Sequence, residues 1–310
     1  MGKLADIRWS EKLGKRVVDA YCKLYDVDID EAAQKGGWQS FDAFFTRSLE
    51  EGARPIANEP GIVVSPSDGR LESTGTIDAN RTFLVKGRPY RVEELLGDAH
   101  EAARYEGGGG CVIYLSPRDY HRVHSPIAGT IVEVRSLPGD YFPVNAIGIK
   151  HVPNLFVRNR RVAIIIENPD FGRVAVIMVV AIVVGRITVS GIPAWDVPLG
   201  VHTPNLSVEA GDEIGQFHLG STAVCLFEPR GFDRFVAQEG PIRLERRENR
   251  MTSRPDPEEL AARDADPAGE PARVSRESDR IPTAAEGGAA RREPRGLVVA
   301  PIRRLPARRS

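Results

Sequence analysis

The sequence predicts an α+β fold, with a β-rich core of short antiparallel strands and peripheral N-terminal amphipathic helices. Two observations support this prediction. From about residue 60 to about 245, short β-branched apolar runs alternate with Gly, Pro and Asp turns, as in antiparallel sheets. Before that region, apolar residues recur at helical spacing. At 310 residues and 34.0 kDa, the chain can bury one sizeable core or two small ones.

The N-terminal region contains two expected helices. The first, over residues 4–26, is amphipathic, because lysines and arginines surround apolar side chains at helical spacing: Leu13, Val17, Tyr21 and Leu24. Such a helix either packs on its own domain or lies in a membrane interface, and the pattern alone leaves both open. The second helix is expected over 37–50, with Ser40 as its cap.

The central region is expected to be mainly strands, interrupted by one helix over 91–104. The strands are expected over residues 129–134, 162–166, 174–184 and 223–227. The run 174–184 is the longest apolar stretch, and it is too short to span a bilayer. After about residue 246, aromatic residues vanish and Arg, Glu, Ala, Pro and Gly dominate. Such a composition buries too little apolar surface to fold, so 246–310 is expected to be a disordered tail.

Composition excludes several classes of protein. Lys plus Arg is 42 and Asp plus Glu is 43, so no net charge points to nucleic acid as a partner. The three cysteines, Cys22, Cys111 and Cys225, are widely spaced and odd in number, which favours neither a disulfide framework nor a zinc site. The chain opens without an apolar leader segment, so a reducing, intracellular compartment is expected.

The stretch Leu219-Gly220-Ser221-Thr222 is the most informative motif. It lies between the turn Ala210-Gly211-Asp212 and the apolar run 223–227. Gly-Ser-Thr alone is a common triplet, but a serine here could attack the preceding backbone carbonyl. Gly220 has no Cβ and can therefore adopt a strained backbone that exposes this carbonyl.

An acid and a base also stand in the sequence. His121 and His124 lie in the run Tyr114 to Pro126, and Asp68 lies in Ser67-Asp68-Gly69. With Ser221 they supply the residue types of a catalytic triad, which is defined by geometry and not by chain order. The plainer alternatives are a tight Asp-Gly turn and two structural imidazoles. A zinc pair is disfavoured, because no further ligand stands at a suitable spacing.

Several stretches together resemble one known family, in its order, over about two-thirds of the chain. They are Phe44 to Leu49 with Arg54-Pro55-Ile56, Ser65 to Gly69, Tyr114 to Pro126, Pro138-Gly139-Asp140 with Val144-Asn145, Val152 to Asn159, and Gly215 to Thr222. On these residues the chain resembles bacterial phosphatidylserine decarboxylases, which are self-cleaving pyruvoyl enzymes. The histidine run and Gly-Ser-Thr are the most specific parts.

The resemblance implies a pyruvoyl-dependent carboxy-lyase. Ser221 would cut the Gly220–Ser221 bond by an N-to-O acyl shift and elimination, and become the pyruvoyl group. Phosphatidylserine would then lose CO2 through a Schiff base to that group, giving phosphatidylethanolamine. His124 and Asp68 match the family's triad positions, with His124 as the base for cleavage and Asp68 as the group that fixes its tautomer. His121 matches a residue of the decarboxylation step. No metal and no pyridoxal phosphate are implied.

Five residues are candidates for substrate binding. Arg118, Arg122 and Arg158 could hold a phosphate or a carboxylate, although arginines of this kind are more often surface ion-pair partners. By resemblance, Asn154 and Phe156 would line the lipid side of the site.

The resemblance also implies partners and a location. The substrate would lie in an anionic membrane, with the enzyme bound peripherally at its cytoplasmic face. Residues 1–58 would be the membrane-associating helical segment and 59–245 the catalytic domain. Cleavage would give a large chain, 1–220, and a small chain, 221–310, and a homodimer is compatible with the family. Nucleic acid is not expected.

The chain departs from the family pattern in one stretch. Val180, Ile182 and Arg186 replace a glycine, a threonine and a serine, which puts the shape or efficiency of the site in question if these positions line it.

Two alternatives come from other classes. One is a serine hydrolase that uses Asp68, His124 and Ser221 on an external ester, although a Gly-x-Ser-x-Gly elbow is missing. The other is a non-catalytic lipoyl-like β module, because the turns at 138–140 and 210–212 resemble its hairpins. No lysine lies beside either turn.

Overall fold

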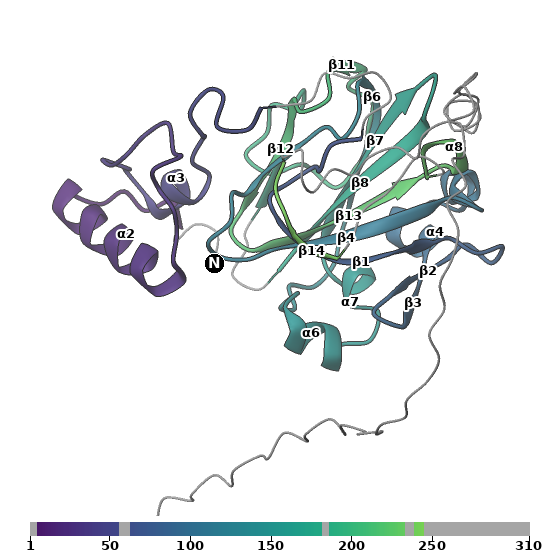
Figure 1. The fold of residues 1–310 in the computed structure, drawn as a ribbon, viewed down its shortest axis with the longest axis horizontal. Helices are drawn as coiled ribbons and strands as arrows, with labels where there is room; N and C mark the ends of the chain where they lie inside the picture. The colour runs from purple at the N-terminus through teal and green to yellow at the C-terminus, as the bar shows by residue number, and fades with distance from the viewer. Residues whose placement is uncertain (1–4, 56–62, 182–185, 233–238, 245–310) are drawn as a thin grey trace, which may run out of the picture. The chain divides into compact units, whose positions relative to one another are not determined.

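The computed structural model describes residues 5–55, 63–181, 186–232 and 239–244 (Figure 1). The described residues all belong to one unit of the chain, Met1–Asp264. The predicted disordered tail, 246–310, and the departure at Ile182 lie outside the described residues.

A nine-stranded antiparallel sheet forms the centre of the described part, as the sequence predicts. Its order is β10-β6-β7-β8-β13-β4-β1-β14, and β11 also pairs with β6. The strands are β1 (Gly69–Thr76), β4 (Gly109–Leu115), β6 (Gly129–Leu137), β7 (Arg161–Asn168), β8 (Gly172–Val180), β10 (Gly200–His202), β11 (Leu206–Val208), β13 (Ser221–Phe227) and β14 (Gly240–Ile242).

The middle of this sheet is buried on both faces. All seven residues of β13 are buried, and so are the apolar residues of β8 beside it and of β7, the next strand. Continuous β-branched runs suit strands that are covered on both sides, which explains why 162–166, 174–184 and 223–227 are such runs. These strand predictions are confirmed, although β8 ends at Val180 and residues 182–184 are not described.

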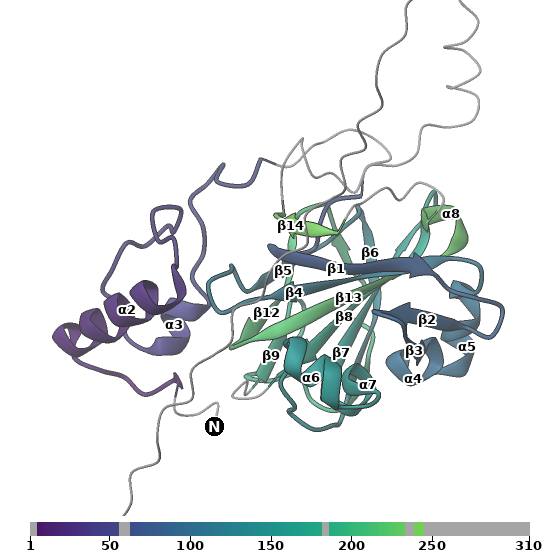
Figure 2. The same ribbon diagram turned by 60° about the horizontal axis from the view of Figure 1, so that its bottom comes forward.

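A second, three-stranded sheet has the order β5-β12-β9. Its strands are β5 (Arg122–His124), β12 (Glu213–His218) and β9 (Arg186–Val189). It lies close to the large sheet at Gly215, where a Cβ atom would be 2.9 Å from the sulfur of Met178 on β8. The chain passes from this sheet to the large one between β12 and β13, which can be followed in Figure 2.

The expected helix over 91–104 is broken into three pieces. These are α4 (Val92–Leu96), α5 (Ala99–Ala102) and the 3-10 turn η1 (Ala103–Tyr105). The break occurs because Gly97 ends α4 with φ 69° and Asp98 caps α5 by accepting from the Glu101 N–H at 2.8 Å. The α4 helix packs beside a hairpin of β2 (Thr82–Val85) and β3 (Arg88–Arg91) (Figure 2). Three further short helices, which the sequence did not predict, are α6 (Ala146–His151), α7 (Leu155–Arg158) and α8 (Pro229–Phe232).

In the part of the chain that the structure describes, helices α2 and α3 precede the sheets. The first, α2 (Glu11–Tyr25), begins at the cap Ser10. The second, α3 (Phe41–Phe45), has the predicted cap, since the Ser40 hydroxyl accepts from the Ala43 N–H at 3.1 Å. It is shorter than the predicted 37–50, because the following residues turn into an extended segment in which Leu49 bridges Ala32.

The apolar residues of α2 point in two directions. Val18 is buried in a small cluster with Val27, Trp38 and Phe44, whereas Leu13 and Leu24 are 52% and 73% exposed. The helix therefore packs on its own domain and also presents apolar side chains outward. Among the described residues, no helix is long and apolar enough to cross a membrane.

Candidate active site

Ser221 lies where the two sheets meet. It is the first residue of β13, paired with Leu115 on β4 and with Val180 on β8. Ser221 is 1% exposed, and its hydroxyl has no hydrogen-bond partner among the described residues. A buried hydroxyl normally finds a partner, because leaving it unpaired costs about 1–3 kcal/mol. The hydroxyls of Ser67, Tyr90 and Thr222 are also unpaired in the described part of the chain, so Ser221 is a candidate functional group because its free Oγ coincides with a strained backbone and a cavity.

Only two residues, Leu219 and Gly220, join β12 to β13. Leu219 has φ 90°, in a region that non-glycine residues rarely adopt and that costs on the order of 1–3 kcal/mol. Strain was expected at Gly220, but the structure places it one residue earlier. Within the described part of the chain, no atom beyond the neighbours of Gly220 lies within 4 Å of where its Cβ would be, so the space beside it is open.

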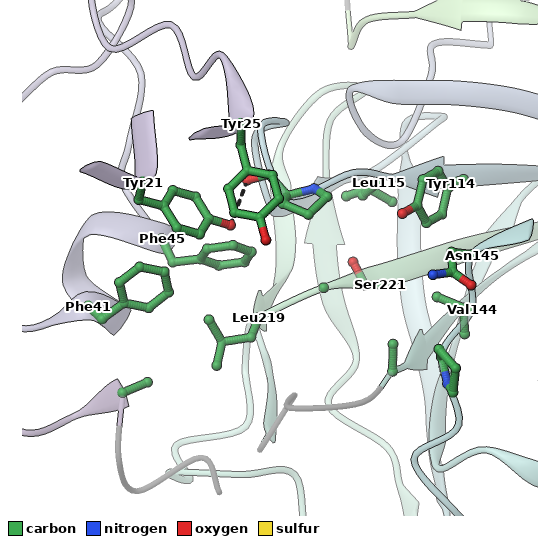
Figure 3. A pocket seen from close by; sticks show the side chains of 15 residues that line it. Tyr21, Tyr25, Phe41, Phe45, Tyr114, Leu115, Val144, Asn145, Leu219 and Ser221 are labelled. Carbon is green, nitrogen blue, oxygen red and sulfur yellow. Dashed lines mark hydrogen bonds between the residues drawn. The ribbon is translucent and has the colours of Figure 1, made fainter. Parts of the chain in front are cut away.

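Ser221 opens into an apolar cavity of about 620 Å³ (Figure 3). Aromatic side chains from α2 and α3 form one side, and the loop before α6 forms the other. The lining residues are Ala5, Tyr21, Tyr25, Phe41, Phe45, Tyr114, Leu115, Pro117, Pro143, Val144, Asn145, Ala181, Leu219, Gly220 and Ser221. A concave, mostly apolar site with few polar groups suits an amphiphilic small molecule.

His121 is fully buried beside this cavity. Its ring packs on Phe45, with 4.0 Å between ring centroids, and Phe45 lines the cavity. Its Nδ1 donates to the Asp119 carbonyl at 2.8 Å, and no described residue forms a hydrogen bond with its Nε2. Burial lowers the pKa of His121 to about 3. The imidazole is therefore neutral at pH 7 and carries a free lone pair on Nε2.

His124 has partners at both ring nitrogens. Its Nδ1 donates to the Gly211 carbonyl at 2.7 Å, and its Nε2 accepts from the Tyr120 hydroxyl at 3.2 Å. Burial lowers the pKa of His124, and the Gly211 bond together with the charges of Glu213 and Asp68 offsets part of this. In the intact chain a backbone carbonyl fixes the tautomer, whereas the sequence analysis expected Asp68 to do so.

Asp68 lies near His124 but binds other groups. The backbone N–H of His124 donates to the Pro66 carbonyl at 2.7 Å, which holds the 65–69 stretch against β5. The Asp68 carboxylate accepts from Arg54 at 2.7 Å and from the Leu244 N–H at 2.7 Å. Asp68 thus acts on His124 through its charge, and the two share no hydrogen bond among those of the described residues. In the described contacts, neither side chain bonds to the Ser221 hydroxyl.

The three candidate arginines lie outside the cavity lining. Arg122 donates to the Thr46 carbonyl and pairs with Glu213 at 2.7 Å, so it ties α3 to β12. Arg158 pairs with Asp140 at 3.2 Å and lies over the Phe142 ring. Arg118 borders a second, polar cavity of about 340 Å³, which also contains Asp68 and Arg54.

The two other substrate-binding candidates also lie away from the cavity lining. Phe156 is buried and stacks on Tyr90, with 5.1 Å between centroids. Asn154 is the left-handed residue before α7, with φ 51°. Both roles remain predictions.

The structure adds residues that the sequence analysis did not assign. Tyr21 stood out only as part of a helical stripe, yet its hydroxyl donates to the Pro117 carbonyl at 3.1 Å at the cavity wall (Figure 3). Phe45, Tyr114 and Asn145 lay in the stretches that carry the resemblance, but nothing in their spacing indicated that they share a cavity.

The site fits a pyruvoyl group made from its own serine. Three features support this fit: the Ser221 Oγ has no hydrogen-bond partner among the described residues, the connection Leu219-Gly220 before it is strained at Leu219, and a cavity lies in front of it. Within the described ranges, no group of three or more His, Cys, Asp or Glu side chains is placed to hold a metal ion.

Comparison with known proteins gives consistent matches. A family model described as phosphatidylserine decarboxylase matches residues 41–245. The chain is 39% identical to the phosphatidylserine decarboxylase proenzyme of Pseudomonas aeruginosa over 250 residues, which cover 74% of this chain and 84% of the relative. The Bordetella pertussis proenzyme is 38% identical over 266 residues, covering 79% and 86%. The matched residues of the family model include both histidines, Asp68 and the Gly220–Ser221 bond.

Proposed function

Because the chain belongs to the phosphatidylserine decarboxylase family, we propose that it converts phosphatidylserine to phosphatidylethanolamine and CO2. We further propose that it is a proenzyme, which cuts itself between Gly220 and Ser221 and turns Ser221 into a pyruvoyl group. The observation that carries this is the buried, unpaired Ser221 hydroxyl directly after a strained two-residue crossing.

Self-cleavage needs a base and an exposed carbonyl. The Ser221 Oγ gives up its proton and attacks the carbonyl carbon of Gly220, while the amide nitrogen of residue 221 takes a proton and leaves. This converts the peptide bond to an ester. Loss of the Cα proton of residue 221 then expels the Gly220 carboxylate. Hydrolysis of the remaining group with release of ammonia gives the pyruvoyl end. His124 is the proposed base. Its Nδ1–H is bound to Gly211, so its lone pair is on Nε2, and this nitrogen must exchange the Tyr120 hydroxyl for that of Ser221 before it can take the proton.

In the decarboxylation step, the pyruvoyl group supplies a ketone that takes up the substrate amine and accepts the electrons left when CO2 departs. The chain's own residues do the rest. The apolar cavity excludes water, and its aromatic wall from α2 and α3 can contact the lipid's apolar part. His121 is neutral, so its free Nε2 can take a proton from the substrate's ammonium group and pass it to the carbon that CO2 leaves.

We also propose that the protein binds membranes peripherally, at the cytoplasmic face. Two features of α2 support this proposal. Its outer face exposes Leu13 and Leu24, and Lys12, Lys15 and Arg16 provide positive charges for anionic headgroups. The same helix contributes Tyr21 and Tyr25 to the cavity, so a lipid reaching the site would pass along it.

A lipid assay tests the proposed function. Purified protein is incubated with vesicles that contain phosphatidylserine, and the CO2 and phosphatidylethanolamine formed are measured. Activity should be lost in Ser221→Ala and after treatment with hydroxylamine, which reacts with a pyruvoyl ketone. A protein that releases fatty acid instead, as one uncut chain, would fit the serine hydrolase alternative. Decarboxylation that survives in Ser221→Ala would contradict the pyruvoyl mechanism.

A further inference from the structure

His218, the last residue of β12, stands two residues before the proposed cleavage bond and is held at both ring nitrogens. Its Nδ1 donates to Oδ1 of Asp42 on α3 at 2.7 Å. Its Nε2 lies 3.2 Å from the Thr188 hydroxyl on β9. The side chain is 8% exposed, so these contacts are made away from competing water. Two separate elements thus fix this end of β12.

Asp42 is itself held in place. Arg186, which lies directly opposite His218 in the β12–β9 register, donates to Oδ2 of Asp42 at 2.7 Å. Its other terminal nitrogen donates to Asp6 at 2.6 Å. We call Asp42, Arg186 and His218 the Asp42 cluster; Asp6 binds Arg186 from outside it. Arg186 is one of the positions where the chain departs from its family's pattern, and here it pairs with Asp42.

The cluster borders the strained crossing. After His218, only Leu219 and Gly220 separate the three-stranded sheet from the large one, and Leu219 has φ 90° (Figure 3). Ser221 is fixed on the far side by strands β4 and β8. Such a backbone conformation persists only while the structure around it holds both ends. If the His218 end were released, Leu219 could relax and turn the Gly220 carbonyl away from the Ser221 hydroxyl.

We propose that His218, through its hydrogen bond to Asp42, is a positioning residue for self-cleavage. It keeps the Gly220 carbonyl within reach of Ser221, and it makes α3 in the N-terminal segment part of the cleavage machinery. This inference rests on the proposed self-cleavage at Gly220–Ser221. It assigns no chemical step to His218, which touches neither reacting atom in the described contacts.

Two substitutions of His218 distinguish the contact of its Nδ1 with Asp42 from the contact of its Nε2 with Thr188. Asparagine places an amide nitrogen at the distance of Nδ1 from the backbone, so His218→Asn can keep the Asp42 bond. Glutamine reaches to the position of Nε2, so His218→Gln can keep only the Thr188 contact. We expect His218→Gln to slow self-cleavage by on the order of 10- to 100-fold, because a small misplacement of reacting groups has effects of this size. We expect His218→Asn to cleave within about threefold of the wild-type rate.

The experiment follows the uncut fraction of freshly expressed full-length chain by intact mass over time, together with the thermal midpoint of each variant. Asp6→Asn is the matched control, since it removes a charge beside the Asp42 cluster but leaves the His218–Asp42 bond, and it should cleave at about the wild-type rate. The proposal is overturned if His218→Gln cleaves normally, if His218→Asn is as slow as His218→Gln, or if Asp6→Asn is equally slow. A wild-type chain that stays whole contradicts the proposed function itself, which is a different result.

Discussion

The two histidines of the 114–126 run differ in what their ring nitrogens contact. His121 leaves Nε2 unpaired beside the cavity, whereas His124 binds Gly211 and Tyr120. The sequence suggested two roles for these histidines, but it could not indicate which imidazole has a ring nitrogen without a hydrogen bond. That distinction depends on carbonyls and hydroxyls contributed by distant parts of the chain, which no local pattern encodes.

This difference leads to a prediction about the two alanine variants. His124→Ala should accumulate as the uncut chain, because it lacks the proposed base for Ser221. His121→Ala should still split into two chains but release CO2 from phosphatidylserine on the order of 100- to 10,000-fold more slowly, the usual contribution of a general acid or base. Electrophoresis and a CO2 assay measure the two steps separately. Swapped behaviour of the two variants would reverse the assignment.

The buried His121 also predicts a pH dependence of stability. The folded-state pKa is about 3, whereas an exposed histidine titrates near 6.5, so between these values only the unfolded chain takes up a proton there. The free energy of unfolding should therefore fall as the pH drops below about 6.5, by up to about 1.4 kcal/mol per pH unit from this group. Above that pH, His121 adds no pH dependence.

Urea unfolding of Ser221→Ala, with and without His121→Gln, at pH 4.5, 5.5, 6.5 and 7.5 measures this effect. We expect the added substitution to lower stability at pH 7.5 and to make the decline below pH 6.5 shallower. Parallel curves for the two proteins would show that His121 is not held neutral by burial.

At the scale of elements, sequence patterns predicted the structure where neighbouring residues determine the local conformation. The Ser40 cap and the apolar strand 223–227 follow from neighbouring residues, and both are confirmed. The prediction of one helix over 91–104 was wrong in its extent, because Gly97 and Asp98 divide this segment into shorter helices. The grouping of Tyr21, Phe45 and Ser221 around one cavity could not be predicted, because α2, α3 and β13 meet only through tertiary packing.

The exposed face of α2 yields a prediction about membranes. Replacing Leu13 and Leu24 together by serine should weaken binding to phosphatidylserine-containing vesicles by on the order of tenfold or more, because each leucine inserted in a membrane contributes about 1.5–3 kcal/mol. Self-cleavage should continue, since both side chains point away from the cavity lining. Co-sedimentation with vesicles measures binding. Leu84→Ser, at a similarly exposed leucine on β2, is the control. If the wild type, the double variant and this control bind vesicles equally, α2 packs on its own domain and does not bind membranes.

For the molecule as a whole, the proposed cut falls in an unusual place. It would make Ser221 the first residue of the small chain, and β13 would remain between β4 and β8 of the large chain. Seven buried strand residues paired on both sides should hold the two chains together after the bond is broken.

We therefore expect the two chains to co-elute in size exclusion under native conditions and to separate only in denaturant. The uncut Ser221→Ala protein, measured beside the cut one, should elute at the same volume. Dissociation of the small chain without denaturant would contradict the central position of β13.

The most direct test of the central claim is the intact mass of the purified protein. Wild-type protein should give two species of about 24 and about 10 kDa, in proportion to residues 1–220 and 221–310 of the 34.0 kDa chain. The smaller species should carry a pyruvoyl end and lack a free α-amino group, and Ser221→Ala should stay whole. A wild-type protein that remains a single 34.0 kDa chain, or a small chain with an ordinary serine at its N-terminus, would contradict the account.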